Sequence, residues 1–195
     1  MNKNDSCKNC QNNITHERIN KMANSELKNR LLKKIETLKT SPSSSKAIFR
    51  SETKLVEGVL CNATIRQFNL NIDEPVELGG NDVAPNPVEL VLAALGTCQE
   101  ILYSAYSAVT EIPIESVKVN VKGTLDLKGL FALDENTDAG FQEIEYETEI
   151  VSPADEKDVK ELINLVENHC PVLDTLTRKV NVTGRTKITR KLNAA

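Results

Sequence analysis

The spacing of apolar residues predicts three helices. Residues 25–38 place five apolar side chains on one face and most of their Lys and Arg on the other, which indicates an amphipathic helix. Residues 86–110 are mostly apolar after the helix-starting pair Asn86-Pro87, so a long helix buried on several sides is expected there. Another amphipathic helix is expected at residues 152–169.

Alternation of apolar and polar residues predicts strands between and after these helices. Residues 115–127 place Val on one face and mostly Lys on the other, and residues 141–150 place Ile, Tyr and Thr opposite a row of Glu. These two segments are expected to be antiparallel neighbours with cross-strand charge pairs on their solvent face. Shorter strand-like segments are residues 47–49, 54–60, 64–72 and 180–188.

A Ser- and Pro-rich stretch, TSPSSSK at residues 40–46, divides the chain into two parts. We expect an N-terminal arm with one helix at residues 1–46 and a main domain at residues 47–195. Residues 1–50 hold eleven Lys and Arg against four Asp and Glu, whereas residues 51–195 hold thirteen against twenty-four. Because the basic arm lacks interleaved aromatic residues, we expect it to dock on the acidic body of its own protein or of a dimer mate, not on nucleic acid or a membrane.

Composition favours a soluble, cytoplasmic protein. Hydrophobic residues make up 39% of the chain, which is enough to fold a core. No apolar run of membrane-spanning length is evident, and the polar N-terminus does not resemble a secretory signal. The five cysteines are an odd number, which argues against a disulfide framework and for reduced thiols.

Cys98 is the first candidate for chemistry, because it lies more than two turns inside the apolar helix that begins after Asn86. Asn86 and Glu89, three residues later, form the pattern of a capping box. A buried cysteine usually behaves as a small hydrophobic residue, and burial alone raises the pKa of a thiol. A reactive Cys98 therefore needs a cation and a second group from elsewhere in the fold.

Two residues outside this helix could meet those needs. Arg66, the only arginine between residues 51 and 177, lies in a strand-like segment, and a guanidinium keeps its charge even when buried. The alternative is an arginine that faces solvent. Cys170 ends the last predicted helix, but a bond to Cys98 requires Cα atoms within about 7 Å. His169 beside it is either a base or a helix-terminal cap.

The motif CKNC places a second pair of thiols, Cys7 and Cys10, in the arm. C-x-x-C occurs in redox dithiols and in zinc sites. The surrounding residues do not resemble a thioredoxin-like unit, and a tetrahedral zinc site needs two more ligands, of which His16 offers one. We expect a dithiol of unassigned use in preference to a metal site.

Four separated segments resemble the OsmC/Ohr family of thiol peroxidases. They are DEPVELGGNDVAPNPVELVLAALGTC at residues 73–98, DLKGLF at 126–131, GFQEI at 140–144 and HCPVLDTL at 169–176. The resemblance extends over residues 47–191 and leaves out the N-terminal arm. It implies an α+β fold, in which curved antiparallel sheets wrap around central helices in an intertwined homodimer, with the helical arm as an addition.

The resemblance also implies roles for individual residues. The peroxidatic cysteine of the family corresponds to Cys98, the resolving cysteine to Cys170, and the arginine that activates the thiolate corresponds best to Arg66. Hydroperoxide-resistance members place a glutamate directly after the proline, whereas here Val88 takes that position and Glu89 follows, as in the P-x-E-L branch of OsmC-like proteins. One residue turns a helical side chain by about 100°, so Glu89 is expected to cap the helix instead of pairing with the arginine.

The expected function is reduction of hydroperoxides, organic ones in particular, through a Cys98 sulfenic acid and a Cys98–Cys170 disulfide. An external dithiol would reduce the disulfide, and the resemblance implies no metal or organic cofactor. The alternative is a non-enzymatic thiol module on the same fold that senses redox state or binds a small hydrophobic ligand. The Val88 departure and the CKNC arm favour this alternative.

Overall fold

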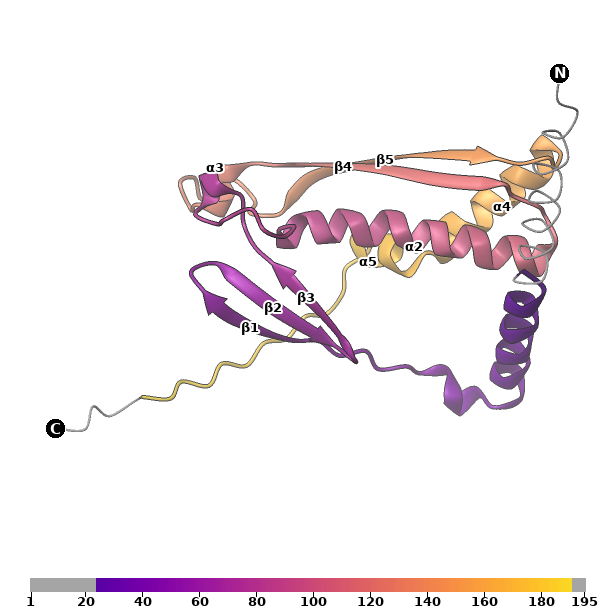
Figure 1. Cartoon of the computed structure of the whole chain (residues 1–195), viewed down its shortest axis with the longest axis horizontal. Coiled ribbons are helices and arrows are strands. Elements are labelled where there is room, and N and C mark those ends of the chain that lie inside the picture. Colours follow the sequence, from indigo (N-terminus) through magenta and orange to yellow (C-terminus); the bar gives the residue numbers. More distant parts are fainter. Residues whose placement is uncertain (1–23, 191–195) are drawn as a thin grey trace, which may run out of the picture.

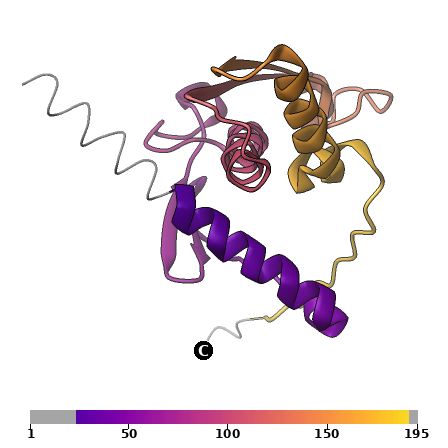
Figure 2. The same ribbon diagram turned by 90° about the vertical axis from the view of Figure 1, so that its right-hand side faces the viewer.

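The structure, a computed structural model, describes residues 24–190 of the chain. Its central element is helix α2, Pro87–Thr110, which lies along the hairpin formed by β4, Ser116–Leu125, and β5, Phe141–Val151 (Figure 1). Helix α4, Glu156–His169, packs on α2 from an adjoining side, as the view along α2 shows (Figure 2). This mixture of helices and antiparallel strands confirms the predicted α+β class.

The core forms where α2 meets α4 and the hairpin. Tyr103 of α2 and Leu162 and Val166 of α4 are its fully buried side chains. Gly96 lets α2 approach β4 closely, because a Cβ at this position would lie 3.3 Å from the Val121 side chain. Since Gly96 is two residues before Cys98, this contact fixes where the candidate thiol lies relative to the sheet.

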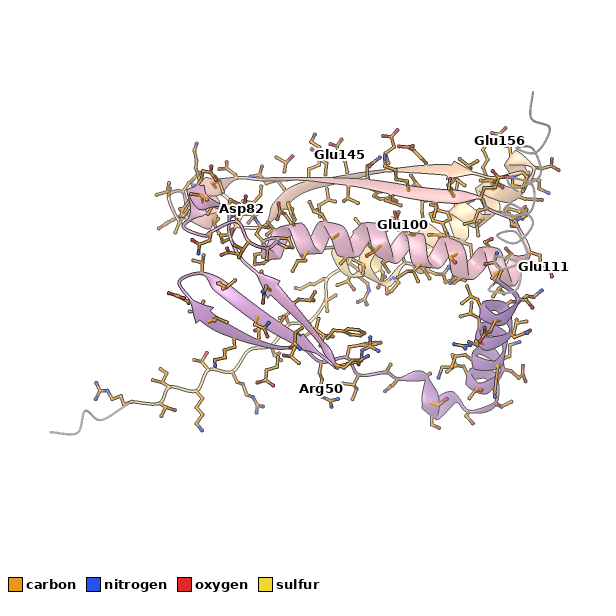
Figure 3. All side chains as sticks on the ribbon, in the orientation of Figure 1. Arg50, Asp82, Glu100, Glu111, Glu145 and Glu156 are labelled. Atoms are coloured by element: carbon orange, nitrogen blue, oxygen red, sulfur yellow. The ribbon has the colours of Figure 1, made fainter. Side chains whose placement is uncertain are left out.

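Cross-strand charge pairs on the hairpin confirm the predicted pairing of its two strands. The side chains of Lys118 and Lys122 on β4 lie 3.5 and 3.2 Å from those of Glu149 and Glu145 on β5. Figure 3 shows Glu145 on the outer face of the hairpin, away from α2. Exposed pairs of this kind add little stability, so their main effect is on register.

A second antiparallel sheet stands apart from the hairpin on another side of α2 (Figure 1). Its strands are β1, Glu52–Glu57, β2, Leu60–Ile65, and β3, Phe68–Ile72. The strands expected at residues 54–60 and 64–72 are each interrupted by a turn. Gly58 and Arg66 lie in these turns, with positive φ values of 53° and 56°, and the chain reverses there.

Two further strand predictions are wrong, because neither residues 47–49 nor residues 180–188 form a strand in the described part of the chain. Phe49 is 91% exposed and Val182 is 87% exposed. Within residues 24–190, no backbone hydrogen bond joins either segment to another strand. An alternating pattern indicates a strand only when the fold supplies that neighbour.

The predicted amphipathic helix of the arm is present at residues 24–40, and the 3-10 turn η1, Pro42–Ser45, lies in the predicted linker. Lys28 of this helix forms an ion pair with Glu111 at the end of α2 and holds the pKa of that carboxyl below its usual value. Cys7 and Cys10 lie outside the described residues.

Helix α2 is the one helix within residues 24–190 that is long and apolar enough to cross a membrane. The expectation of no apolar run of that length was therefore too strict. The core helix of a folded domain meets the same criterion, and α2 packs against β4, α4 and a further short helix, α5, Pro171–Thr177.

Candidate active site

The structure brings Cys98 and Cys170 together where α2, α4 and α5 meet. Cys98 is half-buried in the middle of α2, and Cys170 is fully buried between the end of α4 and the start of α5. Both are free thiols, and they are close enough for a side-chain hydrogen bond between them. The two cysteines selected from the sequence therefore share one site.

Backbone N–H groups at the start of α5 are directed at both sulfurs. Cys170 is the N-cap of α5, and its Sγ accepts a hydrogen bond from the N–H of Leu173 at 3.5 Å. The N–H of Val172 lies near enough to Cys98 to lower the pKa of that thiol. First-turn N–H groups have no partner inside their own helix, so the sequence Cys170-Pro171, which starts α5, makes these donors available.

The surroundings of Cys98 within one chain disfavour its thiolate. Burial is the main cause that raises the pKa of Cys98 above its ordinary value, and the Cys170 thiol raises it further. The N–H of Val172 lowers the pKa and offsets only part of this effect. No cation among residues 24–190 lowers the pKa of Cys98, so this thiol is protonated at pH 7 in the isolated chain.

Arg66 does not contribute to this site within one chain. It lies in the turn between β2 and β3, and its guanidinium is exposed above the Phe68 ring, 5.1 Å from the ring centroid. No acidic side chain in the described part of the chain pairs with it. The activating role of Arg66 therefore stays a prediction.

Glu89 and His169 both bond to their own helices. The Glu89 N–H donates to Asn86 Oδ1, and the Asn86 N–H donates to Glu89 Oε2, each at 2.8 Å, which completes a capping box at the start of α2. His169 Nδ1 lies 2.8 Å from the carbonyl oxygen of Leu165, four residues earlier. The His169 ring meets Tyr106 edge-on, with ring centroids 6.0 Å apart.

Sequence reasoning missed a group of polar side chains beside the cysteines. Tyr146 of β5 donates a hydrogen bond from its hydroxyl to Glu167 Oε1 of α4 at 3.1 Å. Burial, followed by the charge of Glu167, raises the pKa of Tyr146. Gln99, the residue after Cys98, is 1% exposed. These three residues lie on separate elements, and the alternating pattern of β5 marked Tyr146 only as an inward-facing position.

A cavity beside the β4–β5 hairpin includes neither cysteine. It has a volume of about 620 Å³ and lies beside the short helix α3, Leu127–Leu130, in the long loop between β4 and β5. Its apolar lining comes mainly from Leu125, Phe131 and Leu133. The paired thiols, not this cavity, are therefore the candidate site for chemistry.

Comparison with known protein families identifies the family of this chain. The model of a family described as OsmC-like protein matches residues 79–184, which is more than half of the chain and includes both cysteines. The chain belongs to the OsmC-like family. Its N-terminal arm lies outside the matched residues of that family.

One curated protein and several solved structures are also similar to this chain. The chain is 28% identical over 117 residues to the hydroperoxide reductase of Mycoplasma genitalium, covering 59% of this chain and 77% of that protein. An OsmC-like protein from Mycoplasma pneumoniae has a similar structure, with a TM-score of 0.58 and 24% identity over 67% of this chain and 88% of the other. An organic hydroperoxide resistance protein OsmC from Legionella pneumophila has a TM-score of 0.51 and 21% identity over 68% and 92% of the two chains. These structures establish the fold.

Proposed function

We propose that this protein is a hydroperoxide reductase with Cys98 as the peroxidatic and Cys170 as the resolving cysteine. The observation that supports the proposal most is the meeting of the two thiols at the first turn of α5. Membership of the OsmC-like family and the name of the Mycoplasma genitalium relative agree with it.

The chemistry needs only the two thiols and an external reductant. The Cys98 thiolate attacks the distal oxygen of a hydroperoxide, the O–O bond breaks, and an alcohol leaves after taking up a proton. The Cys98 sulfur, oxidised by two electrons, is then a sulfenic acid. The Cys170 sulfur bonds to it, the S–O bond breaks, and water leaves. An external dithiol reduces the resulting disulfide, and we place this cycle in the cytoplasm. The apolar surroundings of Cys98 favour an organic hydroperoxide as substrate.

We infer that the active form is a homodimer, because one chain leaves many large apolar side chains exposed. Ile101 on α2 is 67% exposed, and the exposed apolar side chains of the separate sheet are Leu55, Val56, Phe68 and Leu70. A second copy that packs on α2 and on this sheet would cover these side chains.

A second copy is also our proposed source of the cation that Cys98 needs. Arg66 is the candidate, because its guanidinium is exposed and has no acidic partner among the described residues. An arginine close to a thiol lowers the thiol pKa by favouring the charged form. The dimer would therefore hold Cys98 as the reactive thiolate that the single chain disfavours.

A non-enzymatic thiol module is the second candidate, and the raised pKa of Cys98 favours it. A neutral thiol reacts slowly with peroxides, yet a half-buried one can still sense redox state or contact a small hydrophobic ligand. Slow oxidation of Cys98 by every hydroperoxide, together with tight binding of such a ligand, would select this function.

The test is turnover of cumene hydroperoxide with dithiothreitol as reductant. Cys98→Ser is expected to abolish turnover. Without dithiothreitol, which would reduce a sulfenic acid directly, Cys170→Ser is expected to consume one equivalent of hydroperoxide and to hold a Cys98 sulfenic acid that dimedone traps and mass spectrometry detects. Cys61→Ser is the matched control, because Cys61 is a half-buried free thiol on β2. Full activity of Cys98→Ser would exclude the proposed mechanism.

A further inference from the structure

A hydrogen bond and a buried amide lie beside the two cysteines, and the reaction described above does not use them. Gln99 follows Cys98 on α2 and is almost fully buried. Tyr146 on β5 donates to Glu167 on α4 at 3.1 Å. Glu167 lies three residues before Cys170, in the last turn of α4. The Tyr146–Glu167 bond therefore ties β5 to the helical turn that precedes Cys170, while the Gln99 amide nitrogen beside Cys98 has no bond of its own.

The Gln99 amide has a hydrogen-bonding capacity that the reduced protein leaves unused. Its nitrogen is buried and has no hydrogen-bond partner among residues 24–190. Buried donors without partners are rare, because each has given up its bonds to water. The hydroxyl oxygen of Tyr146 is an available acceptor, and the nearby Gln99 amide opposes the effects of burial and of Glu167 on the Tyr146 pKa. A small rotation of Gln99 would complete a bridge in which the hydroxyl accepts from the amide and donates to the carboxylate.

We propose that the Gln99–Tyr146–Glu167 bridge is a positioning device that holds Cys170 against Cys98 for disulfide formation. The inference rests on the proposed peroxidase function and concerns its second chemical step. Glu167 and Cys170 are about 4.5 Å apart along the helix axis, so fixing one restrains the other. The backbone of Cys170 itself is extended, with φ −72° and ψ 110°, and does not continue the hydrogen-bonding pattern of α4.

The physical argument is that disulfide formation demands close and aligned sulfurs. Reacting atoms must approach to about 3–3.5 Å, and a misplacement of about 1 Å slows such a step by up to about 100-fold. The last turn of a helix has carbonyl groups without partners in the helix, so this turn frays unless other contacts hold it. The bridge supplies such a contact from β5. It takes no electrons or protons from the reaction, in which the new S–S bond replaces the S–O bond and water leaves.

The experiment compares two rates in the full-length protein after mixing with cumene hydroperoxide. Dimedone trapping gives the rate of Cys98 sulfenic acid formation, and alkylation with mass spectrometry gives the rate of Cys98–Cys170 disulfide formation. Tyr146→Phe is expected to slow the disulfide step about tenfold, the effect of losing one hydrogen bond to a charged group, and to change the first step less than twofold. Tyr103→Phe is the control, because the buried Tyr103 hydroxyl is close enough to Glu167 and Tyr146 for both to raise its pKa but forms no hydrogen bond with either among the described residues.

Two variants of Glu167 separate positioning from proton transfer. Glu167→Gln keeps an oxygen that accepts from Tyr146, so it is expected to form the disulfide at nearly the normal rate, whereas Glu167→Leu is expected to resemble Tyr146→Phe. Equal losses in both Glu167 variants, an unchanged disulfide rate in Tyr146→Phe, or an equal loss in Tyr103→Phe would each overturn the inference.

A peroxide-independent measurement distinguishes failure of this inference from failure of the proposed function. Diamide oxidises dithiols without any hydroperoxide, and the Cys98–Cys170 disulfide that it forms requires the same approach of the two sulfurs. Slower disulfide formation by diamide in Tyr146→Phe, with Tyr103→Phe unchanged, would support the bridge even if cumene hydroperoxide never oxidised Cys98. Equal diamide rates in Tyr146→Phe and the native protein would contradict it.

Discussion

Within a single chain, Cys98 has a neighbouring resolving thiol but lacks the charge that would activate it. Burial raises its pKa first, Cys170 adds to that rise, and the N–H of Val172 offsets part of it. A thiol with a raised pKa is mostly protonated at neutral pH, and its reactivity grows about tenfold per pH unit until the pKa is reached. The charge state of this one side chain thus decides between the two candidate functions.

The arginine assignment gives a prediction at the same scale. If Arg66 of a second copy lies beside Cys98, Arg66→Gln should raise the Cys98 pKa by about one unit or more and lower its reactivity at pH 7 about tenfold. The measurement is the rate of iodoacetamide alkylation of Cys98 as a function of pH, followed by mass spectrometry. Arg30→Gln is the control, because Arg30 forms an ion pair with Glu26 within the N-terminal helix. A pKa that rises in Arg50→Gln instead would transfer the role to Arg50.

At the scale of elements, α2 shows how much local sequence can determine. Its start and its capping box follow from Asn86 and Glu89, and its length follows from the apolar run after them. The thiol of this helix is nevertheless approached by the N–H groups of another helix, α5. Pairing between helices depends on packing, and the sequence pattern of either helix alone does not contain it.

The capping box of α2 leads to a prediction that separates capping from catalysis. Asn86→Ala should lower the free energy of unfolding by about 1 kcal/mol, because the N–H of Glu89 loses its acceptor. Glu89→Gln keeps the oxygen that accepts from the Asn86 N–H, so stability and peroxide turnover should both stay close to those of the native protein. Urea unfolding and the cumene hydroperoxide assay check the two properties. A large loss of turnover in Glu89→Gln would show that the carboxylate charge, not the cap, matters.

At the scale of the whole molecule, the sequence predicted the elements better than their partners. The β4–β5 hairpin with its charge pairs agrees with expectation, and α4 does so except that it begins at Glu156 and not at residue 152. Cys98 and Cys170 lie close together as free thiols, and their roles stay a prediction. The predicted strands at residues 47–49 and 180–188 failed because residues 24–190 offer them no partner strand. The predicted strands at residues 54–60 and 64–72 are interrupted by Gly58 and Arg66, which have positive φ. The sequence does not predict that Tyr146 lies near Gln99, because contacts between side chains of separate elements depend on tertiary packing.

The exposed surface of α2 provides the last prediction. Ile101 is 67% exposed in one chain, so replacing it by a charged residue should change the stability of a monomer by less than about 0.5 kcal/mol. If a second copy covers α2, Ile101→Arg instead buries an unpaired charge at the interface and should convert the dimer into monomers. Size-exclusion chromatography with light scattering measures this directly, with Lys157→Glu on the exposed face of α4 as the control. Because the cation for Cys98 would come from the second copy, the monomeric variant should also lose peroxide turnover at pH 7. A dimer that persists in Ile101→Arg, or a monomer with full activity, would show that one chain contains the complete site.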